Sequence, residues 1–319
     1  MIIINIMSPV NSYASAVVQI KAGADEIYVG LQDDYFERLT FSGRAKTSSS
    51  GINVQPDEDE LKRIISYAHE HNVIVNFAAN IQTSTDVLGS SMKQAYLDYV
   101  KKGIELGVDN IIVGDYGNIL LLNENKISKK LVSSVFLSAL NSENVKMLKE
   151  LNVKRIVLQH HMKLSEIESI KKNNDIVVEV FVGVGCSNIE GSCHMIHNCG
   201  EQVQMSLPCK SVFGIIDGEK PEFECNFLDA TLDCALCRMG DLYNAGVDAI
   251  KIVGRDQDYK FTSTITRIHR MCIDTIKRNG TITDKDIQDI IGPIPWWKNF
   301  FCRKGRCKYK TNIFTDCYV

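Results

Sequence analysis

The sequence predicts an α/β fold, a (β/α)8 TIM-like barrel with a cysteine-rich insertion between strands seven and eight. Three observations support this prediction. A helix that ends at a small residue is repeatedly followed by a short β-branched run, successive copies are often about 40 residues apart, and eight such strands can be counted. Strands and helices that alternate in this number are typical of a barrel. A doubly wound open sheet is the alternative, because it produces a similar pattern.

The helix-to-strand junction is clearest in four segments. They read AGADEIYVG (22–30), LGVDNIIVGD (106–115), LNVKRIVLQH (151–160) and AGVDAIKIVGRD (245–256), and a looser copy, HEHNVIVNFAAN, occupies 69–80. Gly23, Gly107 and Gly246 suit the left-handed conformation that often follows a helix end. Runs such as IIV and IKIV are apolar on both faces, as is typical of buried parallel strands.

These junctions give the expected elements and two regions. We expect strands near 2–6, 26–30, 73–79, 110–114, 133–138, 155–159, 177–183 and 249–253. Amphipathic helices are predicted at 58–71, 92–106, 142–151 and 164–172, and a further helix at 259–278. Residues 1–280 would form the barrel, including a cysteine-rich loop at 184–237. Residues 281–319 would form a C-terminal tail with basic, aromatic and cysteine residues.

Composition limits the class of protein. The chain has 319 residues, of which 45% are hydrophobic, so it can bury a large core, and its formal net charge of -3 gives no global reason to expect a nucleic-acid or membrane partner. The apolar run at the N-terminus lacks the flanks of a signal peptide, and no stretch approaches the roughly 18 apolar residues of a membrane span. We therefore expect a cytoplasmic protein, in which eleven reduced cysteines favour metal binding or catalysis over disulfides.

Most of the cysteines lie in the long connection between the seventh and eighth predicted strands. They are Cys186, Cys193, Cys199, Cys209, Cys225, Cys234 and Cys237. Both ends of this set should meet at the C-terminal face of the barrel, where barrel enzymes place their chemistry. Four converging thiolates can hold an iron-sulfur cluster or a structural zinc, and the spacing, with one CxxC, does not decide between the two metals. Some of the seven can also be small buried apolar residues.

Several blocks of the chain together resemble a known family, the collagenase-like peptidases, family thirty-two of the U (unknown-mechanism) class. The blocks read SPVNSYASAVVQIKAGADEIYVG, YAHEHNVIVNFAAN, ELGVDNIIVGDYGNILLL, EVFVGVGCSNIEGSC, PCKS and LDCALCRMGDLYNAGVDAIKIVGRD, and they span Met7 to about Asn279. The resemblance implies a barrel-like fold and, in hydroxylase members, a 4Fe-4S cluster held by four cysteines. Such members serve oxygen-independent ubiquinone biosynthesis or hydroxylate tRNA or ribosomal RNA bases, in some cases with prephenate as the apparent oxygen source. A few other members are described as collagen-degrading.

The resemblance also implies which cysteines bind the cluster. By position these are Cys186, Cys193, Cys209 and Cys234, with Cys237 as the alternative fourth ligand and zinc as the alternative metal. The chain departs from the family pattern elsewhere. EVFVGVG replaces EVFVHG, so the family histidine is absent, Val253 replaces a glutamate in KIEGR, and HHM at 160–162 replaces an arginine-containing strand end. We therefore expect the cluster to be retained and the substrate pocket to differ.

Four further side chains are candidates for catalysis: Asp115, His160 and Arg255 at or just beyond predicted strand ends, and Glu179 within the seventh predicted strand. The two carboxylates can act as acid or base, although a strand-end carboxylate just as commonly caps a loop. His160 can bind a metal or transfer a proton, or it can be a supporting or surface residue. Arg255 can bind a carboxylate or phosphate with its planar fork, or pair with Asp256.

The tail has its own candidates. Cys302, Cys307 and Cys317 lie among basic and aromatic residues, which can contact RNA or a peptide, and the thiols can bind a second metal. A tail that only covers the open end of the barrel is the plainer alternative.

Three functions are compatible with these residues. The one we favour is an iron-sulfur-dependent oxidoreductase, an oxygen-independent hydroxylase of a small molecule, an RNA base or a peptide. The second is a peptidase, although GxSxG, HExxH and a recognisable cysteine-protease signature are all missing from the sequence. The third is a metal-stapled subunit that needs a homologous barrel partner to act.

Overall fold

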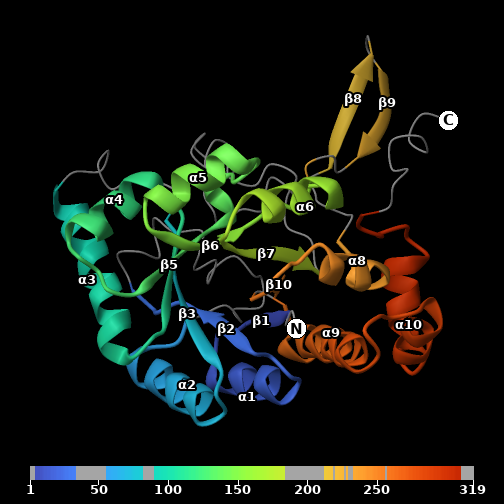
Figure 1. Cartoon of the computed structure of the whole chain (residues 1–319), viewed down its shortest axis with the longest axis horizontal. Coiled ribbons are helices and arrows are strands. Elements are labelled where there is room, and N and C mark those ends of the chain that lie inside the picture. Colours follow the sequence, from blue (N-terminus) through green and yellow to red (C-terminus); the bar gives the residue numbers. More distant parts are fainter. Residues whose placement is uncertain are drawn as a thin grey trace.

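The computed structural model describes residues 4–33, 55–81, 90–183, 212–217, 220–225, 228, 233–255 and 257–309. Eight parallel strands close into a barrel (Figure 1). Their order around it is β1 (Asn5–Pro9), β10 (Ala249–Ile252), β7 (Val177–Val182), β6 (Val153–Val157), β5 (Lys130–Ser133), β4 (Asn110–Val113), β3 (Ile74–Ala79) and β2 (Glu26–Val29). The predicted barrel is confirmed, and the open sheet is excluded because β1 pairs with both β2 and β10.

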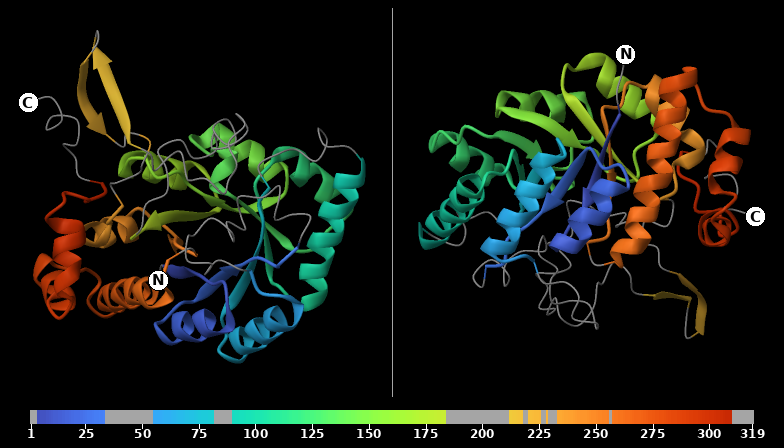
Figure 2. Two further views of the ribbon diagram at one scale, coloured as in Figure 1. Left: turned by 180° about the vertical axis from the view of Figure 1, so that it is seen from behind. Right: turned by 90° about the horizontal axis from the view of Figure 1, so that it is seen from below.

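Helices ring the outside of the strands (Figure 2). They are α1 (Tyr13–Lys21), α2 (Glu58–Glu70), α3 (Ser90–Leu106), α4 (Tyr116–Glu124), α5 (Ser142–Glu150), α6 (Leu164–Asn173), α8 (Met239–Asn244) and α9 (Tyr259–Asn279). Short polar side chains begin several of them. The Asp57 carboxylate, for example, accepts a hydrogen bond from the Glu60 amide at 2.8 Å. None of the described helices is both long and apolar enough to cross a membrane.

Two predicted strands are displaced along the sequence. The first runs from Asn5 to Pro9 instead of 2–6, and the fifth is Lys130–Ser133 instead of 133–138. The apolar run Val135–Leu137 forms a 3-10 turn, which Ser134 caps by accepting from the Phe136 amide at 3.4 Å. Ser138 then ends the turn in the left-handed conformation, with φ 51°. The sequence pattern was misleading here because these side chains are apolar for packing and not for strand pairing: Val135 and Phe136 join the apolar cluster inside the barrel, and Leu137 joins the main core.

The long connection between β7 and β10 contains an antiparallel hairpin that the sequence pattern did not predict. Its strands, β8 (Phe213–Asp217) and β9 (Lys220–Cys225), project away from the barrel (Figure 1). The chain then returns through a short 3-10 turn at Leu236–Arg238 and through α8 to β10.

The described part of the tail packs against the barrel. α9 ends at Gly280, whose φ of 74° places it in the left-handed region, and α10 (Asp284–Ile291) then packs on α9. The chain continues through α11 (Pro295–Trp297) and a π-helical turn at Lys298–Cys302. Trp297 and Phe301 are fully buried in the same hydrophobic core as the barrel strands and helices.

A network of paired charges fills the barrel interior towards the N-terminal ends of the strands. Arg155 on β6 donates to both carboxylate oxygens of Glu26 on β2, at 2.6 and 2.7 Å, and to Glu179 on β7 at 3.1 Å. Lys251 on β10 pairs with the other Glu179 oxygen at 3.1 Å. Both carboxylates are fully buried. Because β6 and β2 lie on opposite sides of the barrel, the Arg155 guanidinium spans its interior.

Amide side chains complete the hydrogen bonds of this network. Asn5 and Asn76 each donate to a Glu26 oxygen at 3.0 Å, and Asn110 donates to Asn76 at 2.9 Å. Burial by itself raises the pKa of Glu26, but the hydrogen bonds and charge of Arg155, with the two asparagines, outweigh it, so that the pKa is lowered below its usual value. Glu26 is therefore held as the anion.

An apolar layer lies inside the barrel beyond these charges. It consists of Met7, Tyr28, Ile112, Val132, Val135, Val157 and Phe181. Lys251 reaches this layer, because its ammonium lies 3.4 Å from the Met7 sulfur. The run IKIV is therefore not apolar on both faces, since its lysine points into the barrel.

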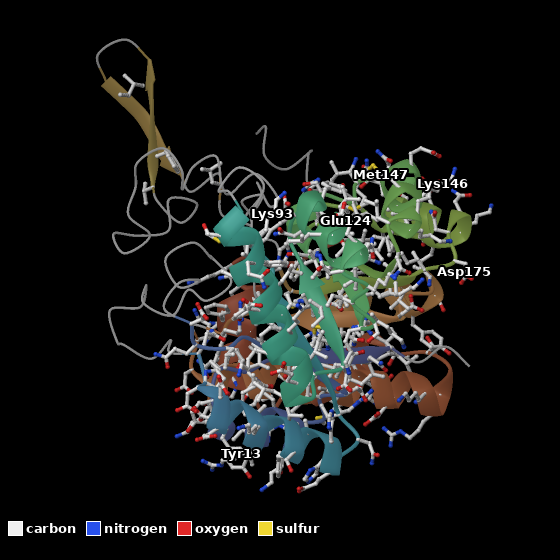
Figure 3. The ribbon with its side chains drawn as sticks, turned by 90° about the vertical axis from the view of Figure 1, so that its left-hand side faces the viewer. Tyr13, Lys93, Glu124, Lys146, Met147 and Asp175 are labelled. Atoms are coloured by element: carbon white, nitrogen blue, oxygen red, sulfur yellow. The ribbon has the colours of Figure 1, made fainter. Side chains whose placement is uncertain are left out.

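Replacing Arg155 with methionine should lower the free energy of unfolding by about 3–5 kcal/mol, because two buried carboxylates lose their partner. The change can be measured by urea denaturation. The matched control is Lys146→Ala, which breaks the exposed Lys146–Glu143 pair on the outside of α5 (Figure 3). That pair should contribute less than about 1 kcal/mol. Equal losses in both variants would contradict a supporting role for the interior network.

The contribution of Glu26 should depend on pH. Because the folded-state pKa is lowered, the ionised carboxylate contributes its full stability above its usual pKa of 4.5 and loses it as the pH falls through the folded-state value. The difference in unfolding free energy between the wild type and Glu26→Gln should therefore be largest near neutral pH and should shrink in acid. Urea titrations between neutral pH and pH 3 test this, with the exposed Glu143→Gln as control. A difference that grows in acid would refute it.

Candidate functional site

The C-terminal ends of the strands form one face, where the long connection leaves β7 and returns to the barrel. The Gly183 amide, directly after β7, donates to the Asp233 carbonyl at 2.9 Å. Gly183 has φ 88°, and a Cβ there would lie 2.6 Å from Ile265 Cγ2. Only glycine therefore fits at this position, where the chain leaves β7. The two ends of segment 184–232 therefore meet at one point on this face.

Only one of the four predicted cluster ligands lies in the described part of the chain. Cys186, Cys193 and Cys209 fall outside the described residues. Cys234 follows Asp233 at the return point and is buried, whereas Cys237, the alternative ligand, is exposed. Cys186 follows Gly183 by only three residues in the sequence. The backbone contact between Gly183 and Asp233 therefore brings the residues on either side of segment 184–232 together, with Cys234 next to the point of contact.

His160 lies at the same end of the barrel, three residues beyond β6. Its ring stacks on Phe181 of β7, with 4.5 Å between ring centroids and 14° between planes, and only 3% of the residue is exposed. The preceding Gln159 donates to the Ser138 hydroxyl at 2.9 Å, which fixes the loop after β6. The imidazole is therefore held against the apolar layer of the barrel interior.

Positive charge gathers around Tyr28 of β2. Lys251 Nζ lies 4.6 Å and Arg255 Cζ 5.2 Å from the centre of the Tyr28 ring, within range of cation–π attraction. Asn11 donates to the Arg255 carbonyl at 2.7 Å and fixes the backbone beyond β10. Burial lowers the pKa of Lys251, although the neighbouring Glu179 opposes this shift.

Two further side chains bring polar atoms to this end of the barrel. Asn80, directly after β3, has a buried Oδ1 without a hydrogen-bond partner among the described residues, while its Nδ2 lies 3.5 Å from the Ser134 hydroxyl. Lys308 of the tail is buried, and its ammonium donates to the Phe181 carbonyl at 3.0 Å. The tail thus contributes a cation beside the residue on which His160 stacks.

The two predicted acid–base carboxylates have structural partners. Asp115 caps α4 by accepting from the Asn118 amide at 3.1 Å. Glu179 is paired with Arg155 and Lys251 inside the barrel. Asp115, His160 and Arg255 thus follow β4, β6 and β10 at the C-terminal end of the barrel, but the Asp115 carboxylate serves as a helix cap.

Sequence reasoning missed three charged residues of the interior network and assigned the fourth, Glu179, to catalysis. A detectable signal was present, because Glu26, Arg155 and Lys251 are charged residues within otherwise β-branched or apolar strand segments. A charge in such a position indicates a polar barrel interior, since the outer face of each strand is covered by helices. Lys308 had no comparable signal, because only the folding of the tail brings it to β7.

The comparisons with known proteins agree with this architecture. Residues 11–308 match the model of peptidase family U32. A solved structure of a U32 peptidase superposes with a TM-score of 0.51, covering 79% of this chain and 93% of that one at 12% identity. This structural similarity shows that the two chains share the same barrel fold.

Three curated relatives cover most of this chain. An uncharacterized protease of Methanocaldococcus jannaschii is 28% identical over 89% of this chain and 68% of its own length. The 23S rRNA 5-hydroxycytidine synthase of Escherichia coli is 25% identical over 86% of this chain, and the tRNA hydroxylation protein P of Escherichia coli is 22% identical over 84%. This chain spans 40% and 67% of the length of those two relatives. Since the family model covers nearly all of the sequence, the chain belongs to peptidase family U32.

Proposed function

We propose that this protein is an iron-sulfur-dependent hydroxylase that acts on an RNA base. The observation that carries the proposal is that two relatives named for RNA hydroxylation each align with more than four-fifths of the chain. The family-model match, residues 11–308, includes β7, the insertion and β10, the elements that frame the candidate site. A peptide or small-molecule substrate is the alternative within the same chemistry.

Four cysteine thiolates are a suitable donor set for an iron-sulfur cluster. Cys186, Cys193 and Cys209 would bind it, and the fourth ligand implied by the family resemblance is Cys234, with Cys237 as its alternative. A 4Fe-4S cluster would supply one-electron transfer beside the C-terminal end of the barrel. The hydrogen bond from Gly183 to Asp233 supports this assignment, because it keeps both ends of the insertion on the same face.

The side chains around the barrel end fit an RNA base. Arg255 adds positive charge that attracts a phosphate or a negatively charged co-substrate, although the whole chain carries a formal net charge of -3. The buried Asn80 Oδ1 can accept a hydrogen bond from an exocyclic amine. His160, packed on Phe181, can donate or accept a proton at a ring nitrogen. Hydroxylation replaces a C–H bond by C–OH and removes two electrons from the base, so the RNA must be accompanied by an oxygen source, for which the family resemblance suggests prephenate, and by a two-electron acceptor.

A peptidase is the second candidate function, because the relative at 28% identity is named a protease. A peptidase would not need the cluster, so it predicts hydrolysis by cluster-free protein that survives Cys186→Ala. Assaying hydrolysis with cluster-free protein therefore distinguishes the two functions.

Protein purified without oxygen should be brown and should contain about four iron and four sulfide ions per chain, in keeping with a cysteine-ligated cluster. Cys186→Ala, Cys193→Ala and Cys209→Ala should each reduce both contents strongly. Cys272→Ala is the matched control, because Cys272 is a buried thiol on α9 that lies outside the insertion. A colourless wild-type protein after anaerobic reconstitution with iron and sulfide would contradict the proposal.

RNA incubated anaerobically with the loaded protein, prephenate and a two-electron acceptor should acquire a nucleoside one oxygen atom heavier, detectable by mass spectrometry after digestion. His160→Asn should lower this rate by about 10²-fold or more while the iron content stays unchanged, because a positioned proton donor or acceptor is lost. Glu143→Gln on the surface of α5 serves as control. Unmodified RNA together with cleavage of peptides by cluster-free protein would favour the peptidase. RNA that is modified only after addition of a homologous barrel protein would favour a partner-dependent subunit.

A further inference from the structure

The tail segment 292–309, which follows α10, concentrates positive charge beside aromatic rings. It contains five basic residues and no acidic one, although the whole chain has a formal net charge of -3. The basic residues are Lys298, Arg303, Lys304, Arg306 and Lys308. A local excess of this kind attracts an anionic partner even when the whole molecule is slightly acidic.

Two of these cations anchor the segment to the barrel. Arg306 Nε donates to the buried Asp233 carboxylate at 3.1 Å, and the Lys308 ammonium donates to the Phe181 carbonyl at 3.0 Å. Phe181 is also the residue on which His160 stacks. The segment is therefore fixed at the C-terminal end of the barrel, next to the candidate site.

The other three cations are available to a ligand. Lys298, Arg303 and Lys304 are exposed, and none of them forms an ion pair with a carboxylate in the part of the chain that the structure describes. The backbone holds them in one compact turn, because the Arg303 amide donates to the Lys298 carbonyl at 2.8 Å and Gly305 turns the chain with φ 64°. Their charges therefore act together on one side of the segment.

Half-buried aromatic rings lie beside this turn. Arg306 Cζ lies 4.5 Å and Lys304 Nζ 5.8 Å from the centre of the Phe300 ring. Phe261 of α9 packs against Phe300 and Trp296, with 5.8 and 5.1 Å between ring centroids, and each of the three rings stays partly exposed. Proteins that bind single-stranded nucleic acids combine such cations, which contact phosphates, with rings on which bases stack.

We propose that the turn 298–305 and the rings of Phe261, Trp296 and Phe300 form the surface on which the single-stranded part of the RNA substrate docks. The inference rests on the proposed function for the choice of RNA, and it adds where the strand lies outside the barrel. The exposed cations would contact phosphates while a neighbouring base enters the barrel end. An acidic peptide would use the charge without the rings. The rings are packed on one another, which favours stacking of a flat base over insertion into a bilayer.

The test is the binding of a short, fluorescently labelled single-stranded RNA to the full-length, cluster-loaded protein, measured by anisotropy at several salt concentrations. The triple variant Lys298→Gln, Arg303→Gln, Lys304→Gln should bind about 10-fold more weakly at low salt, because three phosphate contacts are lost. The slope of the logarithm of affinity against the logarithm of salt concentration should become smaller by about 2, since each phosphate contact on a single strand contributes about 0.7.

The matched control is a second triple variant, Lys149→Gln, Lys154→Gln, Lys172→Gln. It removes the same charge from exposed lysines on α5, β6 and α6, on the outside of the barrel. Affinity and salt dependence should both stay as in the wild type. Circular dichroism and iron content check that each variant is folded and loaded.

Tryptophan fluorescence reports on the rings directly, because the two tryptophans of the chain, Trp296 and Trp297, both lie in this segment. Stacking of a base on Trp296 should quench the fluorescence of the wild type. Trp296→Phe leaves only the fully buried Trp297, so most of this quenching should disappear while the RNA still binds. RNA that binds the wild type without any quenching would overturn the inference, since the strand would then lie elsewhere.

Binding is measured without turnover, so the outcomes separate this inference from the proposed function. Equal affinity of the wild type and the tail variant overturns the inference even if the RNA is hydroxylated. Weaker binding by the tail variant supports it even if no hydroxylated nucleoside forms, in which case the proposed function alone fails. If the RNA is hydroxylated, the tail variant should raise KM and leave kcat unchanged. Polyglutamate that displaces RNA as well as unlabelled RNA does, or binding to anionic phospholipid vesicles by a wild type that does not bind RNA, overturns RNA as the occupant.

Discussion

Arg155 crosses the interior of the barrel from β6 and binds Glu26 on the opposite strand, β2. The same guanidinium reaches Glu179 on β7, which in turn pairs with Lys251 on β10. Buried charges are stable only when each has its partner, so these contacts constrain four strands at once. The shape of the barrel, and with it the position of every strand end, depends on this network.

The network also occupies a different part of the barrel from the candidate reactive groups. Its charges are fully paired near the N-terminal ends of the strands, and an apolar layer covers them. Beyond that layer lie His160, Arg255 and the buried oxygen of Asn80, near the carboxyl ends of their strands. This arrangement follows the usual division in barrel enzymes, in which the bottom of the barrel provides stability and the top provides reactive groups.

A second junction links the insertion to the tail. Gly183, Asp233 and Arg306 come from β7, the end of the insertion and the tail, and their hydrogen bonds bring three remote segments to one point. Trp297 and Phe301 of the tail are buried in the same core as the barrel strands and helices, so the tail is packed firmly against the barrel beside this junction. The junction also fixes Lys308 of the tail beside Phe181 of β7, at the candidate site.

The sequence by itself determined the eight strands, the barrel and the location of the cysteine-rich connection, because buried parallel strands and their helix ends leave a local, periodic pattern. It placed His160 and Arg255 beyond strand ends for the same reason. Only the tertiary structure decided that Glu179 is an ion-pair partner and that Asp115 caps a helix, since both roles depend on atoms from other elements or on local geometry. It alone brought Lys308 to Phe181 and Cys307 to Cys234. Contacts between segments far apart in the chain are set by packing, and packing leaves no regular spacing in the sequence.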